Sequence, residues 1–292
     1  MNLTVLQDGS EKIQYNTPSL PLYVRRGDLY GLSNKAALCH WHDDVELLLC
    51  TEGYLDYNVN GKQIHVCEGN AIFVNSRQMH YGYSTDGSDC HYCCYTFRPQ
   101  ELFCMGDIAD KFVLPLLTSC QLSYLILDSK DLQHHELLNI LKQIDKLYCE
   151  MPDGFELLAL SAIFEFWQQL YFLVKDHLEE SIAVDSNTFV VKQMLAFIRT
   201  HYQDKLTLEM IACSGGVCRT RCCQFFKQYL GQTPNNYLNS FRLEKSMQML
   251  SGTKLSVTEI AASCGFGSSS YFTEMFTREK GFTPTQYRKN LP

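Results

Sequence analysis

The first stretch of the chain alternates apolar and polar residues. From about residue 20 to 98, segments such as YLDYNVNG and KQIHVCEGNAIFVN place apolar side chains at every second position. The pairs Asn60-Gly61 and Glu68-Gly69 are turn signals between such segments. This pattern predicts a set of antiparallel strands with one face directed at a core.

The period becomes helical from Asp131 onwards. Leu137, Leu141, Ile144 and Tyr148 recur at helical spacing until MPDG, residues 151–154, interrupts the run. A second helix follows that is apolar on nearly all sides, which is typical of a helix buried on more than one face. We expect these two helices to cover the sheet and also to meet a partner.

A polar segment without a clear period, HLEESIAVDSN at 177–187, separates this part from the rest. We therefore predict an N-terminal domain over residues 1–178, a linker over 179–187 and a C-terminal domain over 188–292. The C-terminal domain is expected to be all-helical, with helices at 188–202, 207–213, 218–229, 234–251, 256–263, 268–279 and 284–290.

The C-terminal part contains an internal repeat. IACSGGVCRTRCCQFFKQYLGQTPNNY at 211–237 matches IAASCGFGSSSYFTEMFTREKGFTPTQYR at 260–288, with an offset of 49 residues that becomes 50 after one residue is gained near Gly267. Each copy has a short helix, a glycine-containing turn and a longer helix that ends near a glycine. This is the pattern of a helix-turn-helix.

The charge distribution adds a polyanion to the candidate partners. Residues 1–185 carry 12 Lys/Arg and 26 Asp/Glu, a net charge of −14, whereas residues 186–292 carry 13 and 6, a net charge of +7. Two helix-turn-helix units joined by one long helix would present two recognition helices to successive major-groove segments of B-DNA, about 34 Å apart. The simpler alternative is a helical bundle that packs only against itself or another protein.

Composition excludes some other classes of protein. With 46% apolar and 20% charged residues, the chain is expected to be globular rather than disordered. We find no secretory signal and no apolar run close to the roughly 20 residues of a membrane span. The 14 cysteines are expected to stay reduced in a cytoplasm. No glycine-rich phosphate loop or Ser/His/Asp arrangement stands out.

The repeated segment resembles the double helix-turn-helix domain of the AraC/XylS family of bacterial transcription regulators. The similarity covers about residues 188–290, and its second half, IA..CGF.S.SYF...F....G.TP..YR, is highly specific. Two positions of the first half depart from the family. Cys218 stands where a serine usually caps the recognition helix, and Cys222 stands where leucine is common. Cysteine is a poor N-cap, so this helix start is expected to be weaker by up to about 1 kcal/mol.

The resemblance also implies which residues read DNA. These are the exposed positions in the first turns of the two recognition helices: Arg219, Thr220, Arg221, Cys223 and Gln224 in the first unit, and Ser269, Ser270, Thr273 and Glu274 in the second. Arginine can pair with guanine, glutamine with adenine and glutamate with cytosine. The alternative for each is an exposed helix residue without a contact, and serine and threonine can equally bind phosphate.

The N-terminal part carries a second resemblance, to the cupin barrel. HWHDDVE places His40, His42 and Glu46 at even spacing, so that on a strand they would share one face, and His80 follows eleven residues after Gly69. In metal-binding cupins these four side chains hold a divalent ion, and imidazole and carboxylate suit such ions. The AraC-type resemblance instead implies a small-molecule sensor, commonly for sugars, without a metal. Weaker candidates for effector contact are Arg25, Tyr30 and Trp41.

Together these patterns predict an α+β protein: a cupin-like β-barrel with a helical dimerisation hairpin, followed by an all-α domain with two helix-turn-helix motifs. The predicted function is that of a cytoplasmic transcription regulator that binds promoter DNA and a sugar-like effector, with no cofactor, no enzymatic activity and no membrane. It would act as a homodimer, with RNA polymerase as a further candidate partner. The alternative is a metal-dependent cupin enzyme fused to a DNA-binding domain.

Overall fold

The computed structural model describes residues 4–6, 10–17, 20–29, 35–103, 106–178 and 186–289. The chain forms two compact units. The N-terminal unit comprises Lys12–Gly31 and His40–Val184, and the C-terminal unit comprises Met1–Glu11, Leu32–Cys39 and Asp185–Pro292. Most of the predicted linker, residues 179–185, lies outside the described residues. The predicted division into 1–178 and 188–292 stays a prediction, and the compact units differ from it by grouping residues 1–11 and 32–39 with the C-terminal helices.

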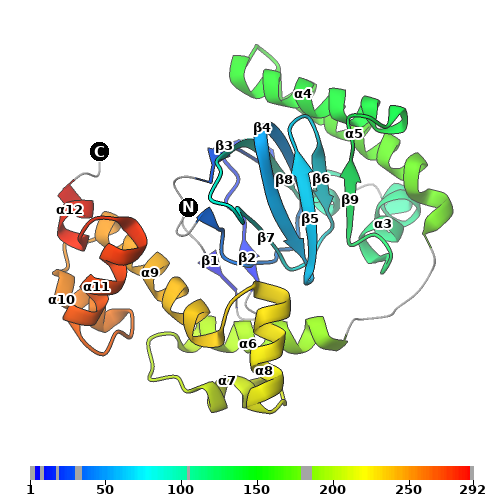
Figure 1. Cartoon of the computed structure of the whole chain (residues 1–292). Coiled ribbons are helices and arrows are strands. Elements are labelled where there is room, and N and C mark those ends of the chain that lie inside the picture. The colour runs from blue at the N-terminus through cyan, green and yellow to red at the C-terminus, as the bar shows by residue number, and fades with distance from the viewer. Residues whose placement is uncertain are drawn as a thin grey trace. The chain divides into compact units, whose positions relative to one another are not determined.

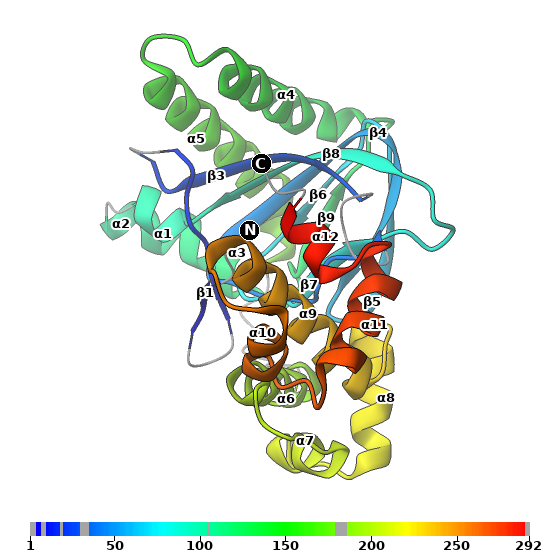
Figure 2. The same cartoon turned by 90° about the vertical axis from the view of Figure 1, so that its left-hand side faces the viewer.

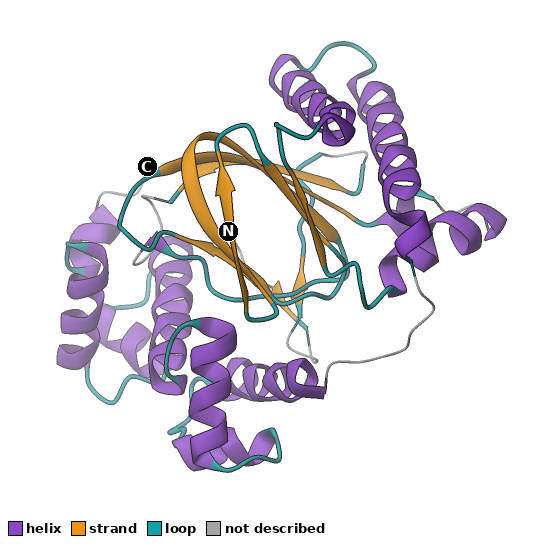
Figure 3. Cartoon of the chain, turned by 45° about the vertical axis from the view of Figure 1, so that its right-hand side comes forward, coloured by secondary structure: helices purple, strands orange, loops and turns teal. Residues whose placement is uncertain are grey.

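The N-terminal unit is built on antiparallel strands (Figure 3). Five of them pair in the order β3-β8-β4-β6-β9, and β5 and β7 also pair with β4. Their bounds are β3 Leu22–Asp28, β4 Val45–Val59, β5 Lys62–Cys67, β6 Ala71–Val74, β7 His80–Tyr83, β8 Cys90–Phe97 and β9 Tyr124–Leu127. The short strands β1 (Thr4–Val5) and β2 (Glu11–Lys12) form a separate two-stranded sheet. The expected antiparallel sheet is therefore present.

The two halves of strand β4 pair with different sets of strands. Its first half pairs with β6 and β8, and its second half pairs with β5 and β7. Between the halves the register with β8 is irregular, at Cys50 and Glu52. Gly53 follows with φ +75°, and a Cβ on it would lie 2.8 Å from the carbonyl oxygen of Asp89. An irregularity of this kind bends a strand and changes which of its residues face inwards.

Helices cover one face of this sheet. They are α1 (Pro99–Leu102), α2 (Gly106–Ile108), the π-helix Ala109–Val113, α3 (Leu114–Thr118), α4 (His135–Glu150) and α5 (Phe155–Val174), with 3-10 turns at Leu132–His134 and Lys175–His177. The predicted break at MPDG is confirmed, because α4 ends at Met151 with φ +42° and α5 begins after Gly154 with φ +75°. Side chains of α4 and α5 share one apolar core with Leu47, Phe73 and Tyr95.

The expectation that no apolar run approaches the length of a membrane span is wrong for α5 and the turn that follows it. The segment Phe155–His177 is long and apolar enough to cross a membrane by length and composition. However, Ala159, Phe166 and Leu170 of this helix are buried in the core of the N-terminal unit. A core helix and a membrane-spanning helix have similar compositions, because both are surrounded by apolar groups and shielded from water. We therefore describe α5 as a core helix.

The C-terminal unit contains seven helices within residues 186–289, and each begins and ends within two residues of its predicted bounds. They are α6 (Ser186–His201), α7 (Leu208–Ser214), α8 (Arg219–Leu230), α9 (Pro234–Gly252), α10 (Val257–Ser263), α11 (Ser269–Lys280) and α12 (Pro284–Lys289). The long helix α9 contacts α6, α7 and α8 on one side of the repeat and α10 and α12 on the other (Figures 1 and 2). One helix therefore joins the two copies of the repeat.

The two copies differ in how their recognition helices begin. Ser268 caps α11, because its hydroxyl accepts a hydrogen bond from the backbone N–H of Tyr271. Cys218 occupies the same position before α8, and its side chain makes no capping hydrogen bond. The first recognition helix therefore lacks the side-chain cap that the second one has, and its weaker start stays a prediction. Both helices end at a glycine with positive φ, Gly231 and Gly281.

A buried arginine fastens α9 to the loop between α6 and α7. Nε of Arg242, on α9, donates to the carbonyl oxygen of Tyr202 at 2.7 Å, and its Nη2 donates to that of Asp204 at 2.8 Å. A Cβ on Gly265 in the second turn would lie 2.5 Å from the same carbonyl oxygen of Tyr202. Arg242 is only 8% exposed. The guanidinium group of Arg242 is therefore bound inside the C-terminal unit.

Candidate functional site

The first candidate site is the pair of recognition helices, α8 and α11. Each helix buries one face, with Cys222, Phe225 and Phe226 in α8 and Phe272, Met275 and Phe276 in α11. The predicted DNA-reading residues lie on the remaining faces. Arg219, Thr220, Arg221, Gln224, Ser270 and Glu274 are exposed, whereas Cys223, Ser269 and Thr273 are half-buried.

Two of these side chains have neighbours that limit their freedom. The guanidinium carbon of Arg221 lies 4.3 Å from the ring centroid of Phe225, so the side chain is held over an aromatic face. The hydroxyl of Thr273 donates to the backbone carbonyl oxygen of Ser269 at 2.8 Å. Among the described residues, Arg219 and Gln224 make no such contact, and they are therefore the strongest base-reading candidates of α8.

Tyr271 is a further exposed side chain of α11 that the sequence motif did not single out as a DNA-reading candidate. This residue is 44% exposed and occupies in α11 the position that Arg221 occupies in α8. Its hydroxyl oxygen accepts a hydrogen bond from Nδ2 of Asn239, on α9, at 3.3 Å. The offset of 50 residues between the copies was enough to find it. The motif alone does not indicate that Tyr271 is exposed, because aromatic residues in a helix are usually buried.

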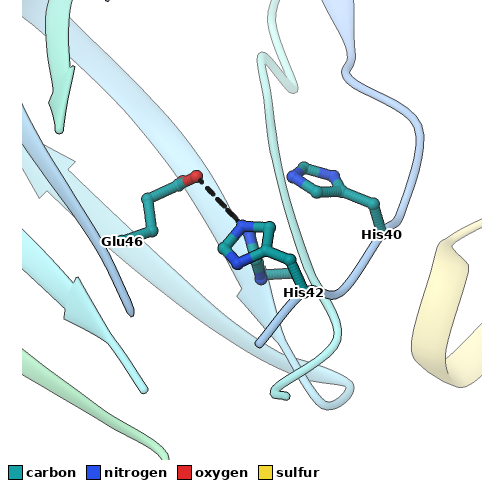
Figure 4. A group of neighbouring side chains, drawn as sticks. His40, His42 and Glu46 are labelled. Atoms are coloured by element: carbon teal, nitrogen blue, oxygen red, sulfur yellow. Dashed lines mark ion pairs between the residues drawn. The ribbon is translucent and has the colours of Figure 1, made fainter. Parts of the chain in front are cut away.

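The second candidate site is a buried polar group inside the N-terminal unit. His40, His42, Glu46 and His80 each direct one potential ligand atom to a common point, and these four atoms lie within 4.8 Å of one another. Figure 4 shows His42 and Glu46 directed towards each other, with His40 beside them. His42, Glu46 and His80 are buried, and His40 is partly exposed. The predicted convergence of these four residues is present in the structure.

The backbone reaches this arrangement by a different path from the one expected. Only Glu46 lies on β4, because His40 and His42 precede the strand. His40 and His80 form an isolated bridge, with N···O distances of 3.1 Å and 2.9 Å. The backbone N–H of Arg77 donates to the carbonyl oxygen of His42 at 2.8 Å. The expectation that the first three residues share one strand face is therefore wrong. Backbone pairing of His40 with His80, at the start of β7, and of His42 with Arg77 brings the group together.

Two of the imidazoles have their orientation fixed by backbone carbonyl groups. Nδ1 of His42 lies 3.0 Å from the carbonyl oxygen of Asp44, and Nδ1 of His80 lies 2.8 Å from that of Gln78. A carbonyl oxygen only accepts hydrogen bonds, so Nδ1 must carry the proton in both rings. Nε2 of each ring then faces Oε2 of Glu46, at 3.7 Å from His42 and 3.5 Å from His80.

Glu46 is held as a carboxylate. Burial raises the pKa of this group, but the charge of His80 and hydrogen bonding by His42 and His80 outweigh burial, and the pKa is well below its usual range. The hydroxyl of Tyr57 donates a hydrogen bond to Oε1 of Glu46. Burial, followed by the charge of Glu46, raises the pKa of Tyr57 well above its usual value. Tyr57 therefore remains a hydrogen-bond donor at every ordinary pH.

The weaker effector candidates have different outcomes. Arg25 is partly exposed on β3, and its charge acts on Tyr23, Tyr92 and Cys94 of the same interior face. Trp41, which stands between His40 and His42 in the sequence, is buried. Tyr30 lies outside the described residues. None of these positions contradicts a role in effector binding, which stays a prediction for Arg25 and Trp41.

Comparison with known proteins bears on both sites. A family model described as an AraC-like ligand binding domain matches residues 31–162, and a model described as a helix-turn-helix domain matches residues 214–290. The HTH-type transcriptional regulator YdeC of Bacillus subtilis is 30% identical over 288 residues, which cover 99% of this chain and 98% of its own length.

The chain belongs to the AraC family.

Less similar proteins match as well. The HTH-type transcriptional activator RhaS of Enterobacter sp. is 27% identical, covering 86% of this chain and 87% of RhaS. Among solved structures, apo ToxT from Vibrio cholerae covers 96% of this chain and all of its own, with 14% identity and a TM-score of 0.48.

Membership of the AraC family decides between the two functions that the sequence left open. The protein is a DNA-binding transcription regulator with a ligand-binding domain, and it is not an enzyme. The alternative of a cupin enzyme fused to a DNA-binding domain is therefore wrong. The histidine and glutamate group lies within the range matched by the AraC-like ligand binding domain.

Proposed function

We propose that a small polar effector binds inside the N-terminal unit and changes how α8 and α11 engage promoter DNA. The observation that carries this proposal is the buried group around Glu46. A carboxylate and two imidazoles are costly to bury, and this cost is not needed for the fold, because the opposite face of the same sheet already holds a large apolar core. Polar groups retained at such a place are typical of ligand sites.

A sugar or sugar derivative fits the chemistry of this interior. Carboxylate, imidazole, guanidinium and phenol groups can each bind a ligand hydroxyl, and the tyrosine rings can stack on a sugar face. Burial raises the pKa of Tyr92, on β8, and the charge of Arg25, on β3, partly offsets this rise. The two side chains are therefore near neighbours. Effector contacts from Arg25, His40, His42, Glu46, His80 and Trp41 are part of this proposal.

In the C-terminal unit, the proposal assigns base reading to the first turns of α8 and α11. Arg219 and Gln224 would read one major-groove segment, and Ser270 and Glu274 the next. Arg221, Thr220, Cys223, Ser269 and Thr273 would bind bases or phosphates around them. The N-terminal end of a helix also favours phosphate contacts, since its backbone N–H groups and dipole attract anions.

We also propose that the protein is a homodimer through α5. Leu157, Phe164 and Phe172 lie on one exposed stripe of this helix, and Leu157 is 74% exposed. Contiguous exposed apolar residues on a soluble protein are typical of an interface. A symmetric dimer places the same helix on both sides of the contact. Sedimentation analysis of Leu157→Glu tests this proposal, because a dimer should become a monomer and an unchanged mass would exclude this surface.

We further propose that the protein activates transcription in the cytoplasm and that RNA polymerase is one of its partners. Relatives named transcriptional activators support it, and the acidic N-terminal half offers a surface of the opposite charge to the C-terminal half. The boundaries 1–178, 179–187 and 188–292 remain the proposed domains.

A thermal-shift screen of the full-length protein tests the effector. A panel of sugars, sugar acids and sugar phosphates is compared with polyols and amino acids of similar size. A ligand at about 100 times its Kd should stabilise the folded protein by roughly 2.7 kcal/mol. A sugar that raises the Tm of the unmodified protein and of His65→Ala, but not of Glu46→Gln, would support the proposed pocket. Equal shifts in all three proteins would place the sugar elsewhere.

A further inference from the structure

Two buried cysteines meet at the bend of β4. Cys50 is the last residue of this strand before its irregularity, and Cys90 is the first residue of β8. Their Sγ atoms lie 3.6 Å apart, so the two sulfurs are in contact. Cys50 is 0% exposed and Cys90 is 1% exposed. Neither residue belongs to the group around Glu46 or to the recognition helices.

The irregularity of β4 explains how these thiols reach each other. In the register of the two strands, Cys50 is opposite Tyr92 and Gly53 is opposite Cys90. Cys50 and Cys90 are therefore diagonal neighbours, and such pairs are about 7–8 Å apart in a regular sheet. Cysteines whose Cα atoms are more than about 7 Å apart cannot form a disulfide without movement of the backbone. Here Thr51 is an additional residue at which the strand bends, and the two sulfurs come together.

Other cysteines of the same sheet have different neighbours. The sulfurs of Cys93 and Cys94, on the same strand as Cys90, contact a carboxylate oxygen and a hydroxyl oxygen. Cys67, on β5, is exposed. The contact between two thiols therefore distinguishes Cys50 and Cys90 from the other described cysteines of this sheet.

The contact makes the two thiols chemically unequal. Hydrogen bonding by the thiol of Cys90 outweighs burial and lowers the pKa of Cys50. The same hydrogen bond, together with burial, raises the pKa of Cys90. Cys50 is therefore the first of the two to ionise, and the thiolate is the form of cysteine that reacts with oxidants.

The pair lies directly beneath the surface of the N-terminal unit. The two residues that follow Cys50 are exposed, and so are the two neighbours of Cys90 along the chain. Hydrogen peroxide is hardly larger than water, so local opening at the start of β8 is sufficient for access. Disulfides in cytosolic proteins are usually transient and redox-sensing rather than structural.

We propose that Cys50 and Cys90 are a site of reversible oxidation, at which a hydroperoxide joins them in a disulfide bond. The Cys50 thiolate attacks one oxygen of hydrogen peroxide, the O–O bond breaks, and the hydroxide that leaves takes up the proton of the original thiol as water. The thiol of Cys90 then attacks the sulfenic sulfur of Cys50. An S–S bond replaces the S–O bond, and a second water leaves with the proton of Cys90. Reduction by a cellular thiol restores the pair.

The disulfide would act on the strand that carries part of the proposed effector site. Glu46 lies before the irregularity of β4 and Tyr57 lies after it, whereas Cys50 is at the irregularity itself. A covalent link from this point to β8 restrains the bend between the two halves of the strand. Oxidation should therefore slow hydrogen exchange of the backbone at the bend by about tenfold or more, and unchanged exchange would exclude this restraint.

The main experiment maps the thiols of the full-length protein. Reduced protein is treated with a small excess of hydrogen peroxide, the remaining thiols are alkylated in denaturant, and the peptides are identified by mass spectrometry. The main linked product should join Cys50 to Cys90, and dithiothreitol should remove it. Alkylation of both cysteines in most of the protein, or a main link to Cys67, would overturn the proposal.

Serine variants separate the two steps. Cys90→Ser keeps a hydrogen-bond donor beside Cys50 and should accumulate sulfenic acid there, which dimedone traps. Cys50→Ser should trap about tenfold less dimedone at Cys90, and equal trapping would overturn the assigned order of attack. Cys67→Ser removes an exposed cysteine of the same sheet and should leave the link unchanged. Because no sugar or DNA is present, these outcomes are independent of the tests of effector and DNA binding.

Discussion

The hydroxyl of Tyr57 donates a hydrogen bond to Oε1 of Glu46, although the two residues lie in different halves of β4. The bond satisfies one oxygen of a buried carboxylate. It also connects the half of β4 that pairs with β6 and β8 to the half that pairs with β5 and β7. The site therefore depends on the bend in this strand.

Tyr57→Phe should lower the free energy of unfolding by about 1–3 kcal/mol, because it leaves a buried charged oxygen without a partner. Urea unfolding followed by fluorescence measures this change. Tyr54→Phe is the control, since the hydroxyl of Tyr54 binds Asp86 at the surface and its loss should cost less than about 0.5 kcal/mol. Equal losses in the two variants would argue against a special role for the buried bond.

Base reading by α8 is tested with Gln224→Ala. Loss of a bidentate contact should cost about 1–3 kcal/mol of discrimination at one base pair and leave the other positions unchanged. Selection from a randomised operator library, followed by sequencing, measures the preference at every position. Gln228→Ala, an exposed glutamine near the other end of the same helix, should leave the preferences unchanged. Relaxed preference in the control, or none in Gln224→Ala, would contradict the proposed docking of α8.

Cys218→Ser should stabilise the C-terminal unit by about 0.5–1 kcal/mol, because serine supplies the cap that cysteine lacks before α8. The reverse change, Ser268→Cys, removes an existing cap and should lose a similar amount. Thermal unfolding by circular dichroism compares the two. A gain in both variants, or a loss in both, would show that capping does not control the starts of these helices.

Gly265→Ala should destabilise the second helix-turn-helix far more than Gly216→Ala destabilises the first. Both glycines have positive φ, which costs an alanine about 1–2 kcal/mol. At Gly265 the added Cβ would also lie 2.5 Å and 2.7 Å from two backbone carbonyl oxygens, whereas at Gly216 no atom lies within 4 Å. Unfolding midpoints give the comparison, and equal costs would mean that the turn moves aside easily.

The contribution of Asp145 to stability should disappear in acid. Burial raises the pKa of this carboxyl group, but hydrogen bonds from Arg26 and Cys93 outweigh burial, so the folded-state pKa is below the unfolded value. A depressed pKa gives stability that is present above the unfolded pKa and is lost as the pH falls through the folded pKa. Asp145→Asn should therefore be less stable than the unmodified protein at pH 6, and the difference should shrink below about pH 4. A constant difference across this range would exclude the mechanism.

The helices of the C-terminal unit could be predicted closely because their signals are local. Glycines, prolines and caps stand beside each helix, and the repeat gives each boundary twice. The four residues of the buried group in the N-terminal unit could be predicted from the sequence. The backbone pairing that brings them together could not. His40 and His42 reach Glu46 through pairing with a segment 40 residues away, which no local pattern encodes.

Tyr57 could not be found from the alternation of β4. Before the irregularity at Cys50 and Glu52, Glu46 and Leu48 face one way at even positions. After it, Leu55 and Tyr57 face the interior at odd positions, because the additional residue changes the alternation. Alternation counted from Glu46 therefore assigns Tyr57 to the wrong face. The bend itself has only one sequence signal, the glycine at position 53.

The single helix α9 also has a consequence for the genome that this protein reads. Since α9 contacts helices of both copies and Arg242 fastens it to the loop after α6, the gap between the two half-sites on DNA should not vary. One inserted base pair would move the second half-site by about 3.4 Å and turn it by roughly 35° around the duplex. True operators should thus share one gap length even where their bases differ, and a search that allows variable gaps would return mostly false sites.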